Sequence, residues 1–254
     1  MNGSFLPGSI TVSALSSEVV YKVEGPDCTS SLPSGSIQMR VFLGGALDDG
    51  ANLMRDDLRA SGVLPNTEPY SAMGYALENA GATMDPALMQ VTGDHALVDW
   101  VMLELREDNG TNTVAGRRAA LVRRDGRVHT PDGSTTLSFN GTAQGRLVSV
   151  RHRNHLGAMC TKILDGDGEM VDFTSASTLL FGTEAERYDG GYMALWPGNA
   201  TDDDNVGYTG NGNDRDQIMS EIGGSVPTNV VTGYLQEDVN LNGFVCYTGT
   251  SNDR

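Results

Sequence analysis

The chain has 254 residues, with 17 lysines and arginines against 33 aspartates and glutamates, and a formal net charge of −16. A surface this acidic disfavours nucleic acid and anionic membranes as partners, and no apolar run approaches the ~20 residues of a membrane span. The 32 glycines indicate many turns and few long helices. Composition therefore excludes a membrane channel, a coiled coil and a basic DNA-binding domain. It favours cation binding where carboxylates cluster.

The first 36 residues are predicted to form an N-terminal arm. Segments 10–15 and 19–23 have the β-branched and apolar composition of strands, and the turn-rich stretch 25–35 separates them from the rest. Two interpretations are open. The arm supplies a first strand to its own domain, or it donates a strand to the sheet edge of a neighbouring copy.

Residues 37–196 are predicted to form a mainly β domain, a β-sandwich or jelly roll. Segment 97–105 is apolar on both faces, as a central strand should be. Asp125-Gly126 and Asp132-Gly133 are hairpin signals, and a short helix is expected within 52–60. Short strands with turn signals at this spacing are typical of sandwiches, whereas neither βαβ alternation nor a glycine-rich nucleotide motif occurs.

The three cysteines, Cys28, Cys160 and Cys246, lie too far apart for a CxxC zinc site. One disulfide with a free thiol and three reduced thiols are both compatible with them. Nothing after Met1 has the charge and hydropathy of a signal peptide. If the protein is exported, as argued below, we expect its precursor to begin upstream of Met1.

Residues 197–254 contain an internal repeat rich in Asp, Asn and Gly. The segment Tyr208–Arg215, YTGNGNDR, recurs further along the chain as Tyr247–Arg254, YTGTSNDR, with most positions identical. Such self-similarity indicates that one structural unit is used twice.

The second copy begins as D-x-N-x-N-G-x-V, the opening of an EF-hand-like calcium loop. In such a loop side-chain oxygens at positions 1, 3 and 5 converge on the cation, glycine at 6 permits a sharp turn, and position 7 offers its carbonyl. Position 12 is Gly249, and an acid arrives only later, which indicates an insertion. The predicted calcium ligands are Asp238, Asn240, Asn242, the Phe244 carbonyl and Asp253.

The first copy is predicted to bind calcium in the same way, although Asp204 stands where the second has its glycine. Its predicted ligands are Asn199, Thr201, Asp203, Asn205, Asp214 and Asp216. A short helix over 216–222 should join the two loops. The matching helix after the second loop would lie beyond Arg254, so we expect a longer protein or completion by another chain. The competing interpretation of both loops is a solvated, metal-free turn.

This constellation resembles a family of secreted surface proteins of Bacteroidetes-type bacteria, often labelled haemagglutinin-like. The matching features cover roughly residues 37–254, and the repeats are also similar to dockerin-type calcium repeats with a longer loop. The matching segments are VDWVMLELR at 98–106, RDG at 124–126, HRNHLG at 152–157, DFT at 172–174 and the two repeats. The resemblance implies export, an outer-surface location and a β-rich domain followed by calcium repeats. It implies no defined activity.

Other chemistry-bearing residues are better explained structurally. His152 and His155 could form half of a zinc site, but a third ligand would have to come from afar, and a buried, hydrogen-bonded role is favoured. The alternating acids of 165–169 indicate a hairpin turn, and no nucleophile elbow or coherent acid–base pair supports a hydrolase. Trp196 is the candidate for stacking on a glycan.

We therefore predict a non-enzymatic extracellular structural protein, stabilised by calcium, that assembles with its own copies through the N-terminal arm into a surface filament or layer. A carbohydrate-binding or adhesin module of a larger secreted protein is the alternative. Neither hypothesis involves nucleic acid or a membrane span.

Overall fold

The computed structural model of the chain describes residues 10–13, 20–23, 35–48 and 52–254. The chain divides into two compact units, residues 1–32 and 33–254. In the first unit β1 (Ile10–Ser13) and β2 (Val20–Val23) pair with each other in antiparallel register. Both segments of the arm predicted as strands therefore contain one, and together they form a two-stranded sheet. Donation of either strand to another copy stays a prediction.

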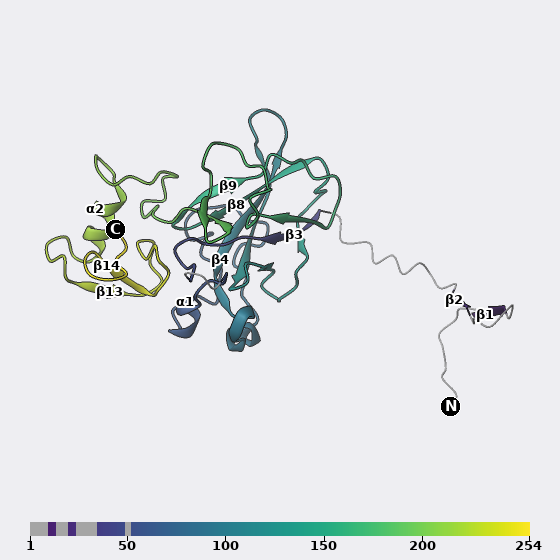
Figure 1. Ribbon diagram of the computed structural model, residues 1–254, viewed down its shortest axis with the longest axis horizontal. Helices are drawn as coiled ribbons and strands as arrows, with labels where there is room; N and C mark the ends of the chain where they lie inside the picture. The colour runs from purple at the N-terminus through teal and green to yellow at the C-terminus, as the bar shows by residue number, and fades with distance from the viewer. Residues whose placement is uncertain (1–9, 14–19, 24–34, 49–51) are drawn as a thin grey trace. The chain divides into compact units, whose positions relative to one another are not determined.

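The second unit is mainly β, as predicted, with several sheets and few helices (Figure 1). Its strands are β3 (Ser36–Arg40), β4 (Leu97–Glu107), β5 (Val114–Arg123), β6 (Val128–His129), β7 (Leu137–Ser138), β8 (Arg146–His152), β9 (His155–Met159), β10 (Glu169–Asp172), β11 (Arg187–Asp189), β12 (Tyr192–Ala194), β13 (Val230–Thr232) and β14 (Phe244–Cys246). Its helices are α1 (Asp57–Ala60), α2 (Asp214–Glu221) and the 3-10 turns Pro86–Gln90 and Gly93–His95.

Two larger sheets, beside the two-stranded sheet of β11 and β12, build the β-domain in a sandwich-like arrangement. One has the strand order β6-β5-β4-β8-β9 and is antiparallel throughout, and the other has the order β10-β3-β7, with β10 parallel to β3. Both sheets contribute buried side chains to one hydrophobic core, among them Ile37 and Met39 of β3 and Trp100 and Leu103 of β4. A parallel pair needs a crossover connection, which the long segment between β3 and β10 supplies.

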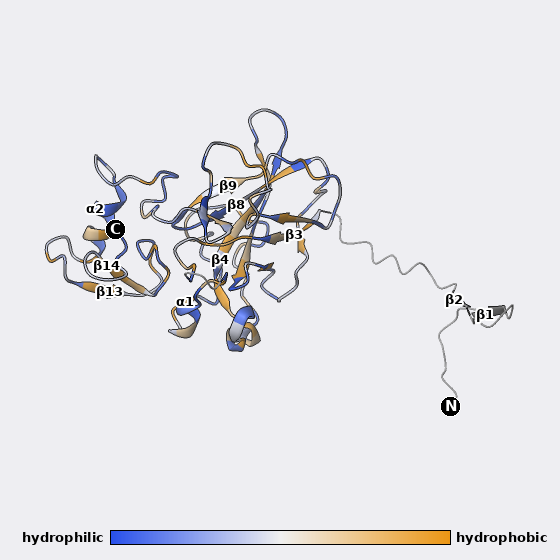
Figure 2. Cartoon of the chain, in the orientation of Figure 1, coloured by the Kyte–Doolittle hydropathy of each residue, from blue (hydrophilic) through white to orange (hydrophobic). Residues whose placement is uncertain are grey.

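Strand β4 is the central strand that the apolar segment 97–105 predicts. Every residue from Leu97 to Leu105 is buried, and the strand is hydrophobic along much of its length in Figure 2. Trp100 faces Leu121 of β5 across the sheet, and its indole Nε1 donates to the carbonyl of Pro65 at 2.9 Å. A buried tryptophan thus keeps its polar atom satisfied.

Two local predictions change in the structure. The helix expected within 52–60 is confined to α1, because Asn52 adopts a left-handed φ of 55° and Met54 pairs with Leu47 in an isolated bridge. Asp132-Gly133 does form a turn, in which Gly133 N donates to Thr130 O at 2.8 Å. The strands that flank it, β6 and β7, nevertheless belong to different sheets.

Residues 197–254 form a module with its own small core inside the second unit. Five buried residues make that core: Ala200, Ile218, Ile222, Val239 and Val245. The helix predicted between the two loops is α2, and Gly223 with φ of 101° follows its end. The hairpin of β13 and β14 lies close to α2 (Figure 1). Because both loops share this core with α2, each depends on the other for its packing.

Two of the three cysteines lie in the described part of the chain. Cys160 and Cys246 are free thiols, whereas Cys28 lies outside the described residues. Among the described helices, none is long and apolar enough to cross a membrane.

Glu186, directly before β11, is a buried acid without a counter-ion. The residue is 4% exposed, and neither carboxylate oxygen has a hydrogen-bond partner among the described residues. Burial, together with the charge of Asp172, raises the pKa of the Glu186 carboxyl to about 8. At neutral pH the side chain is therefore protonated in the folded chain.

Replacing Glu186 with glutamine should make the chain more stable at high pH. The folded pKa lies above the unfolded value of ~4.3, so the folded state holds a proton that the unfolded chain releases between these values. The unfolding free energy of the wild type therefore falls as pH rises through that window. Since glutamine cannot ionise, Glu186→Gln should exceed the wild type by about 1–3 kcal/mol at mildly alkaline pH. Urea unfolding at acidic and alkaline pH measures this difference, and an advantage of the same size at every pH would contradict it.

Candidate metal centre

The two loops of the C-terminal module have the same backbone conformation. Asp202 and Leu241, which occupy equivalent positions of the two copies, both have left-handed φ values, 57° and 58°. Asp204 and Gly243 form a second such pair at the sixth loop position, with φ values of 61° and 85°. Aspartate is one of the few residue types that visit this region with little penalty. The missing glycine therefore does not prevent the first loop from making the turn.

In the second loop the predicted ligands face one another. The Asp238 Oδ1 accepts from Asn242 N at 3.0 Å. The Asp253 Oδ1 accepts from the Asn240 side-chain amide at 2.9 Å, and its Oδ2 accepts from Cys246 N at 2.8 Å. Asp253 therefore returns to the loop that Asp238 opens, as the sequence predicts.

The first loop repeats this pattern. The Asn199 Oδ1 accepts from Asp203 N at 3.1 Å. The Asp214 Oδ1 accepts from the Thr201 backbone and hydroxyl, both at 3.0 Å, and its Oδ2 accepts from Gly207 N at 2.7 Å. These bonds correspond to those of the second loop at the equivalent positions of the repeat. The structure thus brings Asn199, Thr201, Asp203 and Asp214 together, as predicted for this loop.

The extra residues of each loop form a self-contained turn. In residues 247–252, the Asn252 side chain donates to Gly249 O at 2.8 Å, and in the first copy Asn213 donates to Gly210 O at 2.6 Å. Both glycines have left-handed φ values, 101° and 103°, which a side chain would strain. The insertion therefore projects from the loop and delivers the closing aspartate to the same place.

Asp216, the other predicted late ligand of the first loop, bonds to Asn213 rather than to the loop residues that Asp214 contacts. Its carboxylate accepts from the Asn213 side chain at 2.8 Å, and its backbone N–H donates to the Asn213 Oδ1 at 2.9 Å. This reciprocal pair caps the start of α2. The Asp216 side chain therefore belongs to the helix cap, whereas the side chain of Asp214, the first residue of α2, bonds to the loop. Asn205 and Phe244, at the seventh position, stay in the loops, where their N–H groups donate to the side chains at the fifth.

Burial of carboxylates is the main electrostatic feature of the second loop. Asp238 is fully buried and Asp253 is 3% exposed. Burial raises the pKa of Asp253 to about 7, and the charge of Asp238 adds to that rise. Burial also raises the pKa of Asp238 to about 6. Two acids held together out of water are costly without a positive charge between them.

The residues present fit a calcium ion. Calcium takes six to eight oxygens from carboxylates, amides, carbonyls and water, and each loop offers two carboxylates with amide, hydroxyl or backbone oxygens beside them. Across the part of the chain that the structure describes, no group of three or more His, Cys, Asp or Glu side chains could hold a metal ion. The side chains that the two loops offer carry oxygen rather than sulfur or imidazole nitrogen, a donor type that suits a hard cation such as calcium better than zinc.

The carboxylates of 202–204 do not all depend on a metal. Arg151 of β8 donates to the Asp204 Oδ1 at 2.6 Å, which gives this carboxylate a cation from the β-domain. Asp203 stays in the loop, where its Oδ1 accepts from Asn205 N at 3.0 Å. Of these adjacent carboxylates, that of Asp204 therefore pairs with the β-domain, whereas that of Asp203 bonds within the loop.

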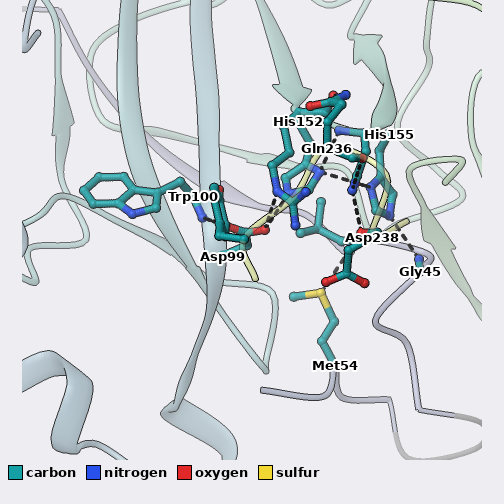
Figure 3. A network of polar contacts seen from close by, with 12 residues as sticks. Gly45, Met54, Asp99, Trp100, His152, His155, Gln236 and Asp238 are labelled. Carbon is teal, nitrogen blue, oxygen red and sulfur yellow. Dashed lines mark hydrogen bonds and ion pairs between the residues drawn. The ribbon is translucent and has the colours of Figure 1, made fainter. Parts of the chain in front are cut away.

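The turn between β8 and β9 joins the module to the β-domain. Its two central residues are Arg153 and Asn154, flanked by His152 and His155, and all four are buried. Figure 3 shows both histidines within one polar network that also contains Asp99, Gln236 and Asp238. The predicted buried role of His152 and His155 agrees with this geometry.

Asp99 of β4 is the hub of that network. Its Oδ2 accepts from His152 Nε2 at 3.1 Å and from Arg153 Nε at 3.2 Å. Its Oδ1 accepts from the Tyr234 hydroxyl at 2.7 Å and from Trp100 N at 2.7 Å. Although burial alone would raise it, the pKa of Asp99 lies below its usual value, because Arg153 and His152 favour the charged form. Asp99 is therefore an ionised carboxylate in the core.

The hydrogen bonds fix both imidazoles in neutral forms. His155 Nε2 accepts from Gly45 N at 3.0 Å, so its proton must sit on Nδ1, which faces His152 Nδ1 at 3.0 Å. His152 Nδ1 then accepts, and its Nε2 donates to Asp99. Burial lowers the pKa of both histidines. The pair is thus a fixed chain of hydrogen bonds.

Asn154 ties the same turn to both loops of the C-terminal module. Its side-chain amide donates to Asp238 O at 2.6 Å and to Gln236 O at 3.1 Å. Its carbonyl accepts from Asn199 N at 3.1 Å, and Gln236 donates in turn to Asn199 O at 3.0 Å. The first residue of each loop, Asn199 and Asp238, is therefore held by one hairpin turn of the β-domain.

Sequence reasoning missed Asp99, Arg153, Asn154, Tyr234 and Gln236. One usable signal was Asp99 itself, since a carboxylate in the middle of a strand that is apolar on both faces must find a buried partner. No local pattern marks the other residues, because their partners lie far away along the chain.

Trp196 lies where a ligand could reach it. The side chain is 39% exposed, its Nε1 donates to Glu184 O at 2.9 Å, and with Phe181 it lines a hollow of about 450 Å³. Glycan binding at Trp196 stays a prediction.

In comparisons with known proteins, no family model, no curated protein and no solved structure matches the chain. The resemblance to haemagglutinin-like surface proteins and to dockerin-type repeats therefore stays a prediction from the motifs.

Proposed function

We propose that this chain is a non-enzymatic extracellular structural protein whose C-terminal module binds two calcium ions. The observation that carries the proposal is the repetition of one loop geometry, in which the closing aspartate accepts from the side chain at the third loop position in each copy of the repeat. A solvated turn needs neither buried carboxylates nor a second copy of the same bonds. The extracellular location follows from the modest calcium affinity expected of such loops, ~10⁻⁴–10⁻³ M, which suits the calcium levels outside cells.

The contacts of the buried polar residues favour a structural role. Asp99, His152 and His155 are the residues with the most obvious chemistry, and all three are buried and bonded to one another. Their hydrogen bonds are used to hold the β-domain against the calcium module. Calcium binding would therefore set the rigidity of the whole second unit.

Assembly through the N-terminal arm is part of the same proposal. Residues 1–32 form a unit of their own, whose described strands make a two-stranded sheet. A sheet of two strands is marginally stable alone in water, and pairing with a sheet edge of another copy would stabilise it. Head-to-tail contacts of this kind propagate into filaments if the rotation between copies does not close.

Negative-stain microscopy with and without EGTA tests the proposal. The intact chain in calcium should form filaments or sheets that fray on chelation. A chain lacking residues 1–32, which leaves β3 intact, should remain as single particles with unchanged calcium binding. If the truncated chain still polymerises, strand donation is wrong. If the intact chain stays monomeric in calcium, the alternative of a carbohydrate-binding or adhesin module is preferred.

A further inference from the structure

Two arginines of the C-terminal module form no ion pair with a described carboxylate, although the chain carries 33 acids against 17 bases. Of the arginines between residues 35 and 254, all except Arg123, Arg215 and Arg254 lie within 4.0 Å of a described carboxylate. Arg215 and Arg254 occupy the same position of the two repeats, directly after the closing aspartates. Because the guanidinium groups of Arg215 and Arg254 form no ion pair with the carboxylates of the two loops, they can bind a negatively charged ligand.

Both arginines line one cavity. Its volume is about 370 Å³, and it lies where the calcium module meets residues 44–45 and Arg187 of the β-domain. That volume falls within the range of small-molecule sites. Arg187 already pairs with Asp189 at 2.6 Å, which leaves Arg215 and Arg254 as the unpaired positive charges of the wall.

Each unpaired arginine stacks on a repeated tyrosine. The Arg215 guanidinium lies 4.7 Å from the centre of the Tyr208 ring, and that of Arg254 lies 5.2 Å from the Tyr247 ring. Stacking fixes the plane of a guanidinium and leaves its edge free to donate. The Arg215 Nε is buried without a hydrogen-bond partner among the described residues. Tyr208 is 60% exposed and also lines the cavity.

These features point to one class of ligand. A planar guanidinium edge matches a carboxylate in a two-pronged hydrogen bond, and an exposed aromatic ring beside it offers an apolar face to a ring-shaped ligand. A long acidic peptide would have to cross a surface of net charge −16 and would be repelled there. Asp214 and Asp253 also line the cavity, but their carboxylates accept from backbone N–H groups of their own loops. A small ring with one carboxylate can therefore bind at the arginine edge of the wall.

We propose that this cavity binds a saccharide that carries a carboxylate, such as a uronic acid unit, through Arg215 and Arg254. The inference goes beyond the proposed structural role, and it rests on the calcium binding that is part of that role. Because each arginine follows the aspartate that closes a metal loop, calcium binding would hold both guanidiniums in place.

Isothermal titration in millimolar calcium tests the inference. The probes are trigalacturonate, the neutral trisaccharide maltotriose and pentaglutamate, of which only the first should bind. Arg215→Gln and Arg254→Gln should each weaken binding by about tenfold or more, which corresponds to the loss of one charge-assisted contact of about 1.4 kcal/mol. Arg127→Gln removes an equally positive side chain that is exposed and far from the cavity wall, and should bind as the wild type does.

Calcium binding by the same samples separates this inference from the proposed function. Both cavity variants should keep normal calcium binding, because neither arginine side chain is among the predicted ligands. Binding of trigalacturonate that is equal in wild type and both variants would overturn the assignment of the site. Binding of pentaglutamate, or of maltotriose as tightly as trigalacturonate, would overturn the ligand class. Failure of calcium binding in the wild type would instead contradict the proposed function.

Discussion

Replacing Asp99 with alanine is expected to lower the free energy of unfolding by about 3–5 kcal/mol. The carboxylate accepts from His152, Arg153, Tyr234 and Trp100 N. Its removal leaves the guanidinium of Arg153, whose side chain is 2% exposed, without its counter-ion. A buried charge without compensation is among the most damaging consequences of a single substitution. Urea unfolding measures the change through its midpoint and slope.

Glu107→Ala is the matched control for this experiment. Glu107 lies on the same strand, β4, and pairs with Arg146, but its side chain is 40% exposed. An exposed ion pair is screened by water, so the control should cost no more than about 1 kcal/mol. Equal losses for the two variants would show that Asp99 is not the organising charge of the core.

Removal of calcium is the second large effect that we expect. At a calcium concentration of about 100 times the dissociation constant, one bound ion stabilises the folded state by about 2.7 kcal/mol, and two ions of equal affinity would give about twice that. In the second loop this stabilisation by calcium originates in the two buried carboxylates of Asp238 and Asp253, which repel each other without a cation. Chemical unfolding in calcium and in EGTA measures the difference.

Three variants decide which residues hold the ions. Asp253→Asn and Asp214→Asn should each remove about half of the calcium-dependent stability, because each closes one loop. Asp216→Asn should keep all of it, since Asp216 caps α2. Loss of the calcium effect with Asp216→Asn, but not with Asp214→Asn, would reverse the assignment of the first loop.

The strands and the repeat were accessible from sequence because their signals are local. The apolar run 97–105 predicts a central strand, and the alignment of the two repeats places Asp214 and Asp253 at the ends of equivalent loops. The role of Asp216 in the helix cap, distinct from that of Asp214, was not accessible. Both follow Asn213 within one helical turn, and only the cap geometry separates a loop ligand from a helix terminus.

The contact between the module and the β-domain could not be predicted, because it depends on pairs far apart in sequence. His152 and His155 stand out as a possible metal motif, yet their partners, Asp99 and Gly45, come from distant parts of the chain. The β-sandwich prediction, likewise, does not specify that β10 pairs in parallel with β3. Such pairings follow from the packing of the whole chain rather than from any one segment.

The single turn that grips both loops has a thermodynamic corollary. Asn154 bonds to the backbone of Asn199 and of Asp238. A change that stabilises the β-domain should therefore also stabilise the position of the first residue of each loop. Linkage is reciprocal: if metal tightens the domain, the domain must tighten the metal by the same factor. The segment 197–254 excised from its neighbour should therefore bind calcium more weakly than it does in the intact chain, with every predicted ligand still present.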